Sequence, residues 1–377
     1  MKKQKICIIG DGLTGLTSAL VLSQLDLEID LVSKNLKIKK SKDNRTTALS
    51  DDNFTFLAKY LTKNDLKNFW ACKKVNLFYE RKNKFYNFMN FEKQNKNIMH
   101  IIENNRIKGI ILKILKKKKN IKLIKGEVNK VITEDTSINI RNKKLFYDLV
   151  LLCLGKESKI TSNLIGNRNI KENYNEKAFT SLVTHNADII YPKQYFLKEG
   201  PLAILPISKK KFSFVWSVEK KYEDNKIKNL IPLKLKKIIN NKRILLSNPI
   251  IYPISFNFNT NFTKKNFLIL GEGSYNIHPV AGQGFNLILR DIRELHSNIY
   301  NNISLGLQIK DSNILKRFVQ SRKPENLMFG LGINFTNKFF KNNKSTALLK
   351  DLILKDIDKF KFLKDLSLRI SNTGIFK

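Results

Sequence analysis

A glycine-bearing loop within residues 267–291 holds the residue types best suited to chemistry against a flat ligand. The segment reads FLILGEGSYNIHPVAGQGFNLILRD, an apolar strand followed by a Gly-Glu pair and a loop with proline and glycine. Glycine lacks a Cβ, so the main chain can approach a ligand closely and adopt positive φ where a turn requires it. Apolar residues recur every three or four positions after Gly284, which predicts a helix that begins there. Its unpaired N–H groups and positive dipole end would stabilise negative charge on the ligand.

A second glycine motif, GDGLTG at residues 10–15, lies near the N-terminus. The apolar residues before it predict a strand, and the helical spacing of apolar residues after it predicts a helix. In that context Gly10 would make the tight turn, Gly12 would admit a pyrophosphate, and Gly15 would allow close packing of helix on strand. The motif therefore predicts a dinucleotide site with the phosphates at the helix N-terminus.

The next predicted strand, residues 28–32, should end near the adenosine ribose of such a dinucleotide. An acidic residue is expected at that strand end, where its carboxylate would accept hydrogen bonds from the ribose hydroxyls. The strand end falls at Ser33, and Asp30 lies before it. We therefore assign the ribose position to Ser33, although a hydroxyl is a weaker acceptor than a carboxylate.

Four motifs together resemble a known family. Besides the two glycine motifs, the chain carries DNRTTALS at residues 43–50 and GPLAILPISKKKFSFVWSV at residues 200–218. In this order and spacing they resemble the ubiquinone-biosynthesis hydroxylases, a branch of the FAD-dependent aromatic hydroxylases (class A flavoprotein monooxygenases), over most of the chain. The resemblance implies an α/β fold with a Rossmann-like FAD-binding domain, an inserted β-rich substrate domain and a C-terminal helical segment. The expected bounds are 1–72, 99–165 and 262–300 for the FAD-binding domain, 73–98 and 166–261 for the substrate domain, and 301–377 for the helical region.

The resemblance also implies which residues form the site. Pro279 would shape the loop above the flavin ring, and the backbone N–H groups around Gly282 and Gly284 would stabilise charge during catalysis. His278 would either assist phenol ionisation or hydrogen-bond the backbone. The residues expected to bind the cofactor are Gly10, Gly12, Leu13, Thr14, Gly15, Ser33, Arg45, Asn104, Gly271, Glu272, Gly282, Gln283, Gly284, Phe285 and Asn286.

Two of these assignments rest on side-chain chemistry as well. Arg45 suits a phosphate or the flavin edge, because a guanidinium delivers paired donors without titrating. Asn104 stands where the family has an amide that meets the cofactor, but it precedes a predicted helix and could equally be its cap.

Four positions depart from the family pattern. Glu272 stands where the family has an aspartate for the ribityl chain, and Tyr275 stands where it often has a histidine. Leu154 replaces an acid that the family links to cofactor and pyridine-nucleotide handling, and Ser33 replaces the ribose-binding acid. These departures bear on cofactor affinity and on reduction by NAD(P)H rather than on fold.

The implied activity is the hydroxylation of a polyprenylated phenol or quinol precursor of ubiquinone. FAD reduced by NADH or NADPH would combine with molecular oxygen to give a C4a-hydroperoxide that transfers oxygen to the ring. Two alternatives stay open: a related flavin oxidoreductase, such as a prenyl reductase or halogenase, and a degenerate flavin-fold protein that binds RNA or acidic lipid. The three cysteines form no close pair, which favours a cytoplasmic location. The resemblance leaves open a contact with the inner face of a membrane and with a ubiquinone-biosynthesis protein complex.

The composition bears on partners and on metal binding. The chain has 70 Lys and Arg against 32 Asp and Glu, a formal net charge of +38 that favours anionic partners. The lysines are scattered and no aromatic-basic recognition motif appears, so compositional bias explains the charge better than a nucleic-acid surface. The spacing of the four histidines and three cysteines predicts neither a metal site nor a disulfide framework.

Two apolar patterns each allow two interpretations. Phe212, Phe214 and Trp216 alternate along a predicted strand and share one face, either over the flavin or in a core. Apolar residues at helical spacing over residues 346–370 predict a tail helix that either packs on its own domain or lies on a membrane surface. No apolar stretch reaches the ~20 residues that a membrane span needs.

Overall fold

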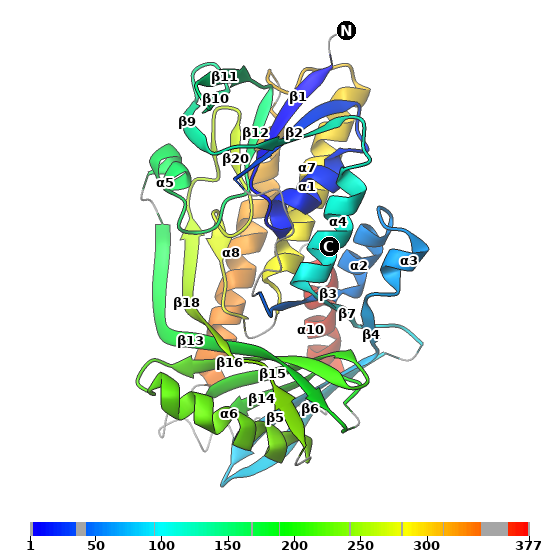
Figure 1. The fold of residues 1–377 in the computed structure, drawn as a ribbon, viewed down its shortest axis with the longest axis vertical. Helices are drawn as coiled ribbons and strands as arrows, with labels where there is room; N and C mark the ends of the chain where they lie inside the picture. The colour runs from blue at the N-terminus through cyan, green and yellow to red at the C-terminus, as the bar shows by residue number, and fades with distance from the viewer. Residues whose placement is uncertain are drawn as a thin grey trace.

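The computed structural model describes residues 3–34, 43–93, 95–166, 169–187, 189–240, 243–279, 282–311, 313–340 and 361–375. A parallel sheet with packed helices occupies one end of the molecule, and a large, mainly antiparallel sheet occupies the other (Figure 1). The long strand β13 (Asn169–His185) and the long helix α8 (Ile314–Phe340) run from the first part towards the second (Figure 1).

The sheet of the first part has the strand order β19-β20-β12-β1-β2-β8 and is parallel except for the β19–β20 pair. Its central strands are apolar on both faces, as expected for parallel strands that are covered on both sides. Ile6 and Ile8 of β1 pack with the helices, whereas Cys7 and Ile9 pack with a three-stranded sheet on the opposite face. The six strands are β1 (Gln4–Ile9), β2 (Leu27–Ser33), β8 (Ile121–Lys125), β12 (Leu149–Leu152), β19 (Thr263–Lys264) and β20 (Phe267–Ile269).

The two faces of this sheet are covered by different elements. The helices on one face are α1 (Leu13–Leu22), α4 (Asn104–Leu115) and α7 (Gly284–Ser304). The opposite face carries β9 (Val128–Ile132), β10 (Ser137–Ile140), β11 (Lys143–Phe146) and α5 (Lys159–Ile165).

A small sheet links the first part to the second. It has the order β3-β7-β4, and in the sequence two helices lie between β3 and β4. Its elements are β3 (Thr46–Ser50), α2 (Asp51–Ala58), α3 (Lys63–Leu66), β4 (Trp70–Cys72) and β7 (Met99–Glu103).

The large sheet has the order β21-β18-β13-β16-β15-β14-β5-β6, with β17 paired to β13. Phe212, Phe214 and Trp216 are fully buried against Ile227 and Ile231 of α6, so this aromatic stripe belongs to a core and not to a surface over the flavin. The elements are β5 (Lys74–Arg81), β6 (Lys84–Glu92), β13 (Asn169–His185), β14 (Lys193–Leu197), β15 (Gly200–Ser208), β16 (Lys211–Glu219), α6 (Asp224–Ile239), β17 (Ile244–Leu246), β18 (Ile250–Asn259) and β21 (Tyr275–Asn276).

Two C-terminal helices, α8 (Ile314–Phe340) and α10 (Lys361–Thr373), pack against the first part through buried polar contacts. Arg322 Nε of α8 donates to Asp291 Oδ1 of α7 at 2.7 Å. Asp291 also accepts a hydrogen bond from Tyr275 Oη of β21 at 2.5 Å. Arg290 Nη2 donates to the Ser371 carbonyl at 2.8 Å. Of the tail helix predicted over 346–370, residues 346–360 lie outside the described residues, and α10 covers the remainder.

The fold class predicted from the sequence is confirmed: a Rossmann-like parallel sheet, a β-rich second part and C-terminal helices. The exact domain bounds stay a prediction. Among the described helices, none combines the length and apolar character that crossing a bilayer requires.

Candidate functional site

The first glycine turn, between β1 and α1, is tightly packed at two glycines and open at the third. Gly10 has φ 118°, and a Cβ at Gly15 would lie 1.9 Å from the Gly10 carbonyl oxygen, so neither position accepts a side chain. A Cβ at Gly12 would have no atom of the described residues within 4 Å. Gly12 is also the N-cap of α1, with extended backbone, so its open side lies at a helix N-terminus. A pyrophosphate suits that position, because the first N–H groups of a helix have no intrahelical partner.

The second glycine turn follows β20 and meets the first. Strands β20, β12 and β1 are parallel neighbours, so their carboxyl ends share one edge of the sheet. Gly271 has φ 90°, and a Cβ there would lie 2.7 Å from Thr14 Oγ1. A single dinucleotide cofactor could span both turns only if they lie close together, as they do here.

Arg45 lies within electrostatic range of Glu272 in the second turn. Its guanidinium donates to both carboxylate oxygens of Asp43, at 2.8 and 2.9 Å, and stacks 4.9 Å from the ring centre of Tyr252. The hydrogen bonds to Asp43 raise the pKa of Arg45 above its usual range, and the nearby Glu272 carboxylate adds to the effect. Arg45 and Glu272 therefore act on each other electrostatically, although they are far apart in the sequence.

The start of α7 is anchored to β3 by Asn286. Its Nδ2 donates to the Ala48 carbonyl at 2.9 Å, and its Oδ1 accepts from the Ser50 N–H at 2.9 Å. Gly282 has φ 60°, and a Cβ there would lie 3.9 Å from Ala48 Cβ, so the loop before α7 also approaches β3. The amide of Asn286 is thus engaged within the protein, and its contact with a cofactor stays a prediction.

Gln283 differs from Asn286, because its Oε1 atom is buried and has no hydrogen-bond partner among the described residues. Buried acceptors in folded proteins are normally paired, so an orphaned one at a predicted site calls for a ligand donor. The unpaired Gln283 acceptor and the open space at Gly12 together fit an extended cofactor. Its phosphates would lie at Gly12, and an N–H donor at its other end would reach Gln283. Leu13 is the first residue of α1 and Phe285 is the second residue of α7, and both are half-buried.

The structure corrects one alternative for Asn104 and places Ser33 as expected. Glu103, not Asn104, is the N-cap of α4, so the cap interpretation of Asn104 is wrong. Asn104 accepts a hydrogen bond from Thr47 Oγ1 at 2.7 Å, and its N–H donates to the Arg45 carbonyl at 3.0 Å. Ser33 is the last residue of β2, whereas Asp30 is held inside the protein by Lys5 at 2.8 Å.

His278 is fully buried beside the half-buried Pro279, and its ring contacts a carboxylate. The distance between His278 Nε2 and Glu176 Oε2 is 2.6 Å. The ring of Tyr174 meets the His278 ring edge to face at 5.1 Å between centres. Residues 280 and 281 of the same loop lie outside the described residues.

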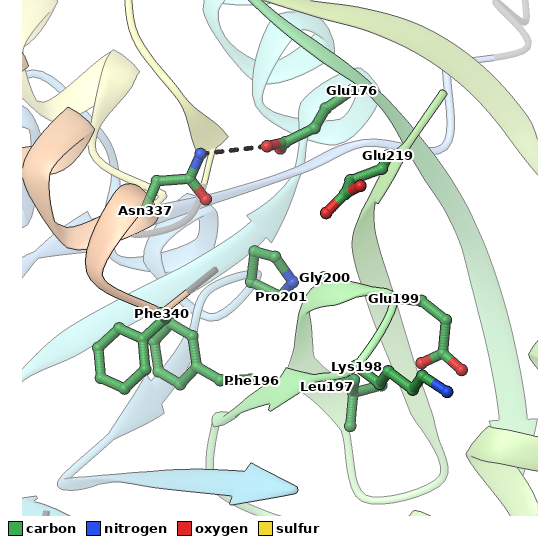
Figure 2. A pocket seen from close by; sticks show the side chains of 10 residues that line it. All are labelled: Glu176, Phe196, Leu197, Lys198, Glu199, Gly200, Pro201, Glu219, Asn337 and Phe340. Carbon is green, nitrogen blue, oxygen red and sulfur yellow. Dashed lines mark hydrogen bonds between the residues drawn. The ribbon is translucent and has the colours of Figure 1, made fainter. Parts of the chain in front are cut away.

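A small pocket, with a cavity volume of about 20 Å³, lies beside Glu176 (Figure 2). Asn337 from the end of α8 donates to Glu176 Oε1 at 3.3 Å, and Figure 2 shows both side chains at the pocket wall. The remaining lining residues are Phe196, Leu197, Lys198, Glu199, Gly200, Pro201, Glu219 and Phe340. No local motif marks Glu176, Asn337 or Tyr252; the folded chain brings Glu176 to His278, Asn337 to Glu176 and Tyr252 to Arg45.

Comparisons with known proteins agree with this geometry. No family model matches the chain. The mitochondrial ubiquinone biosynthesis monooxygenase COQ6 of Dictyostelium discoideum is 29% identical over 186 residues, which covers 40% of this chain and 38% of that protein. The 3-demethoxyubiquinol 3-hydroxylase of Escherichia coli is 26% identical over 156 residues, which covers 40% of each chain. The matches therefore span about two fifths of the length of these relatives.

Solved structures extend the likeness to nearly the whole fold. The p-nitrophenol 4-monooxygenase PnpA from Pseudomonas putida has a TM-score of 0.81 at 14% identity, covering 97% of this chain and 96% of that one. PqsL, a probable FAD-dependent monooxygenase from Pseudomonas aeruginosa, has a TM-score of 0.74 at 14% identity, covering 97% and 100%. The chain thus has ubiquinone hydroxylases among its relatives and the fold of the FAD-dependent aromatic monooxygenases, as the resemblance of its motifs predicts.

Proposed function

We propose that this protein is an FAD-dependent monooxygenase that hydroxylates a polyprenylated phenol or quinol in ubiquinone biosynthesis. The contact between Gly271 and Thr14 carries the proposal, because it joins the turn suited to the phosphates with the turn suited to the ring. The names of the sequence relatives support the substrate class. When bound, FAD reduced by NAD(P)H would supply the activation of molecular oxygen that the hydroxylation needs.

The phosphate end would be held mainly by backbone. Gly12 leaves space at the N-terminus of α1, whose N–H groups and dipole favour negative charge. Ser33, at the end of β2, would accept a hydrogen bond from the adenosine ribose. Glu272 would accept hydrogen bonds from the ribityl hydroxyls while its charge faces Arg45.

The ring end would be held by the start of α7. The backbone N–H groups that follow Gly282 have no intrahelical partner and would stabilise negative charge on the ring during the reaction. Gln283 Oε1 would accept a hydrogen bond from a ring N–H, which would satisfy its orphaned acceptor. The hydrogen bonds of Asn286 to β3 keep this helix end in place, so the donors are oriented before the substrate binds.

The C-terminal helices offer a surface for a lipid-soluble substrate. Met328, Leu331 and Phe335 recur at helical spacing on α8 and are 49%, 49% and 71% exposed, and Phe362 on α10 is 75% exposed. Exposed apolar side chains in a protein of net charge +38 favour the surface of an anionic membrane. We therefore include peripheral contact with a membrane in the proposal.

The proposal is tested with purified protein reconstituted with FAD. The expected result is a yellow protein whose NADPH consumption rises with a short-chain prenylphenol and whose product contains oxygen from labelled molecular oxygen. A yellow protein that instead reduces the prenyl chain or halogenates the ring would support the alternative flavin chemistry. A protein that binds no FAD after reconstitution would overturn the proposal.

A further inference from the structure

A buried asparagine outside the glycine motifs lies next to the start of α7. Asn53 belongs to α2 and is 0% exposed. Its Nδ2 donates to Asn286 Oδ1 at 3.1 Å, to the Asn286 carbonyl at 3.3 Å and to Ser50 Oγ at 3.0 Å. No described residue donates to Asn53 Oδ1. The Asn53 side chain therefore acts as a hydrogen-bond donor, and two of its three acceptors belong to the first turn of α7.

The neighbours of Asn53 require a donor at this position. Asn286 Nδ2 donates to the Ala48 carbonyl at 2.9 Å, and Asn286 Oδ1 accepts from the Ser50 N–H at 2.9 Å. This pairing turns the oxygen of the Asn286 amide towards Asn53. Ser50 Oγ donates its single hydrogen to the Asn372 carbonyl at 3.2 Å, so it can only accept from Asn53. Three acceptors thus surround the Asn53 amide, and its nitrogen is the group that suits them.

Asn53 restricts the Asn286 side chain to one orientation. A reversed Asn286 amide would bring its Nδ2 against two donors, the Ser50 N–H and Asn53 Nδ2. It would also bring its oxygen against the Ala48 carbonyl. Asn286 is 1% exposed, so water cannot replace the partners that the reversed amide would lose. The Asn53 donor therefore favours the orientation of Asn286 that ties α7 to β3.

The orientation of Asn286 bears on the ring end of the proposed cofactor site. Asn286 is the third residue of α7, and its Nδ2 also lies 3.5 Å from the Gly282 carbonyl in the loop before the helix. It thus holds the part of α7 whose backbone N–H groups have no intrahelical partner. Such donors stabilise negative charge best when their orientation is fixed before the charge develops. A side chain that fixes Asn286 therefore influences how well these donors stabilise a ring that gains negative charge on reduction.

We propose that Asn53 is a positioning residue for the ring end of the cofactor site. Through Asn286 it orients the N–H donors at the start of α7, and these donors raise the reduction potential of the bound flavin. The potential rises because the donors stabilise the negative charge of the reduced form relative to the oxidised form. The inference rests on the proposed function, since it needs a bound FAD.

The test compares Asn53→Ala with Asn326→Ala in the FAD-loaded protein. Asn326 is also 0% exposed, and its Nδ2 donates to Asp291 Oδ1 at 3.0 Å, further along α7. Both variants remove a buried amide that holds α7, but only Asn53 reaches its first turn. In Asn53→Ala the affinity for reduced relative to oxidised FAD should fall about tenfold, which lowers the two-electron potential by about 30 mV. Asn326→Ala should lose stability in a urea titration but keep the wild-type potential.

A wild-type potential in Asn53→Ala, or an equal shift in both variants, would overturn the positioning role of Asn53. If Asn53→Ala does not fold, hydrogen exchange in the wild-type apoprotein decides. The Ser50 N–H, which donates to Asn286, should exchange as slowly without FAD as with it, and fast exchange in the apoprotein would overturn the inference. A wild-type protein that binds no FAD would instead refute the proposed function, which separates the two failures.

Discussion

Replacing Gly12 with valine should abolish FAD binding while leaving the protein folded. The prediction follows from the contrast between Gly12 and Gly15 in one motif. A Cβ at Gly12 would have no described atom within 4 Å, whereas a Cβ at Gly15 would lie 1.9 Å from the Gly10 carbonyl oxygen. The new side chain at Gly12 would therefore occupy only the space that the proposed pyrophosphate needs.

The backbone conformation at Gly12 determines how valine changes the stability of the apoprotein. Gly12 has φ −66° and ψ 174°, an extended conformation that valine adopts readily. Replacing glycine at a compatible position restricts the unfolded chain and stabilises the apoprotein by about 0.4–1 kcal/mol. A side chain at Gly15 would instead force the helix away from the turn, which costs about 1–3 kcal/mol or more.

The assay pairs the ratio of flavin to protein absorbance with thermal unfolding of the apoprotein. Gly12→Val should bind no FAD in a titration and should unfold at the wild-type temperature or slightly above it. Gly332→Ala is the matched control, because Gly332 is exposed on α8 and a Cβ there also meets no described atom within 4 Å. It should gain about 0.5–1 kcal/mol of helix stability and bind FAD normally. Wild-type FAD affinity in Gly12→Val would refute the assignment of this turn to the phosphates.

Three further changes probe other contacts. Tyr275→Phe removes a buried hydrogen bond to Asp291 and should lower the free energy of unfolding by about 1.5–3 kcal/mol in a urea titration; an unchanged midpoint would contradict the contact. Glu272→Ala should weaken FAD binding by about tenfold in an absorbance titration, and equal affinity would remove Glu272 from the site. Burial alone would raise the pKa of Asp43, but Arg45 outweighs it and holds the folded pKa below the usual 3.8. The stabilisation by Asp43 should therefore be complete above that pH and be lost on further acidification, and Asp43→Asn should flatten this part of the stability curve.

The parts of the site that the sequence predicted are those with local constraints. Gly10, Gly12 and Gly15 follow a strand and open a helix, so spacing alone predicts close packing at Gly10 and Gly15 and open space at Gly12. Ser33 was placed correctly at the end of β2, because the length of a strand can be read from its apolar pattern. The strand–turn–helix order of the second glycine motif was predictable for the same reason.

The sequence could not predict contacts that depend on where distant elements meet. Asn104 precedes a helix and resembles a cap, yet the chain pairs it with Thr47 across two strands of the small sheet. Glu176 lies in a polar stretch with no motif, and only a bulge in β13 brings it to His278. The aromatic stripe at Phe212 has the same alternation whether a helix or a cofactor covers it.

The end of α10 supports both β3 and the first turns of α7. Asn372 Oδ1 accepts from the Asp52 N–H at 3.0 Å, and the Asn372 carbonyl accepts from Ser50 Oγ at 3.2 Å. Ser50 in turn donates its N–H to Asn286, so the end of α10 supports β3 on the side opposite the loop. Arg290, one turn further along α7, donates to carbonyls at the end of α10, where a cation is favoured by the helix dipole. Because β3 and α7 are both fixed by α10, the donors at the start of α7 are oriented by the fold itself, and binding of the cofactor need not supply that order.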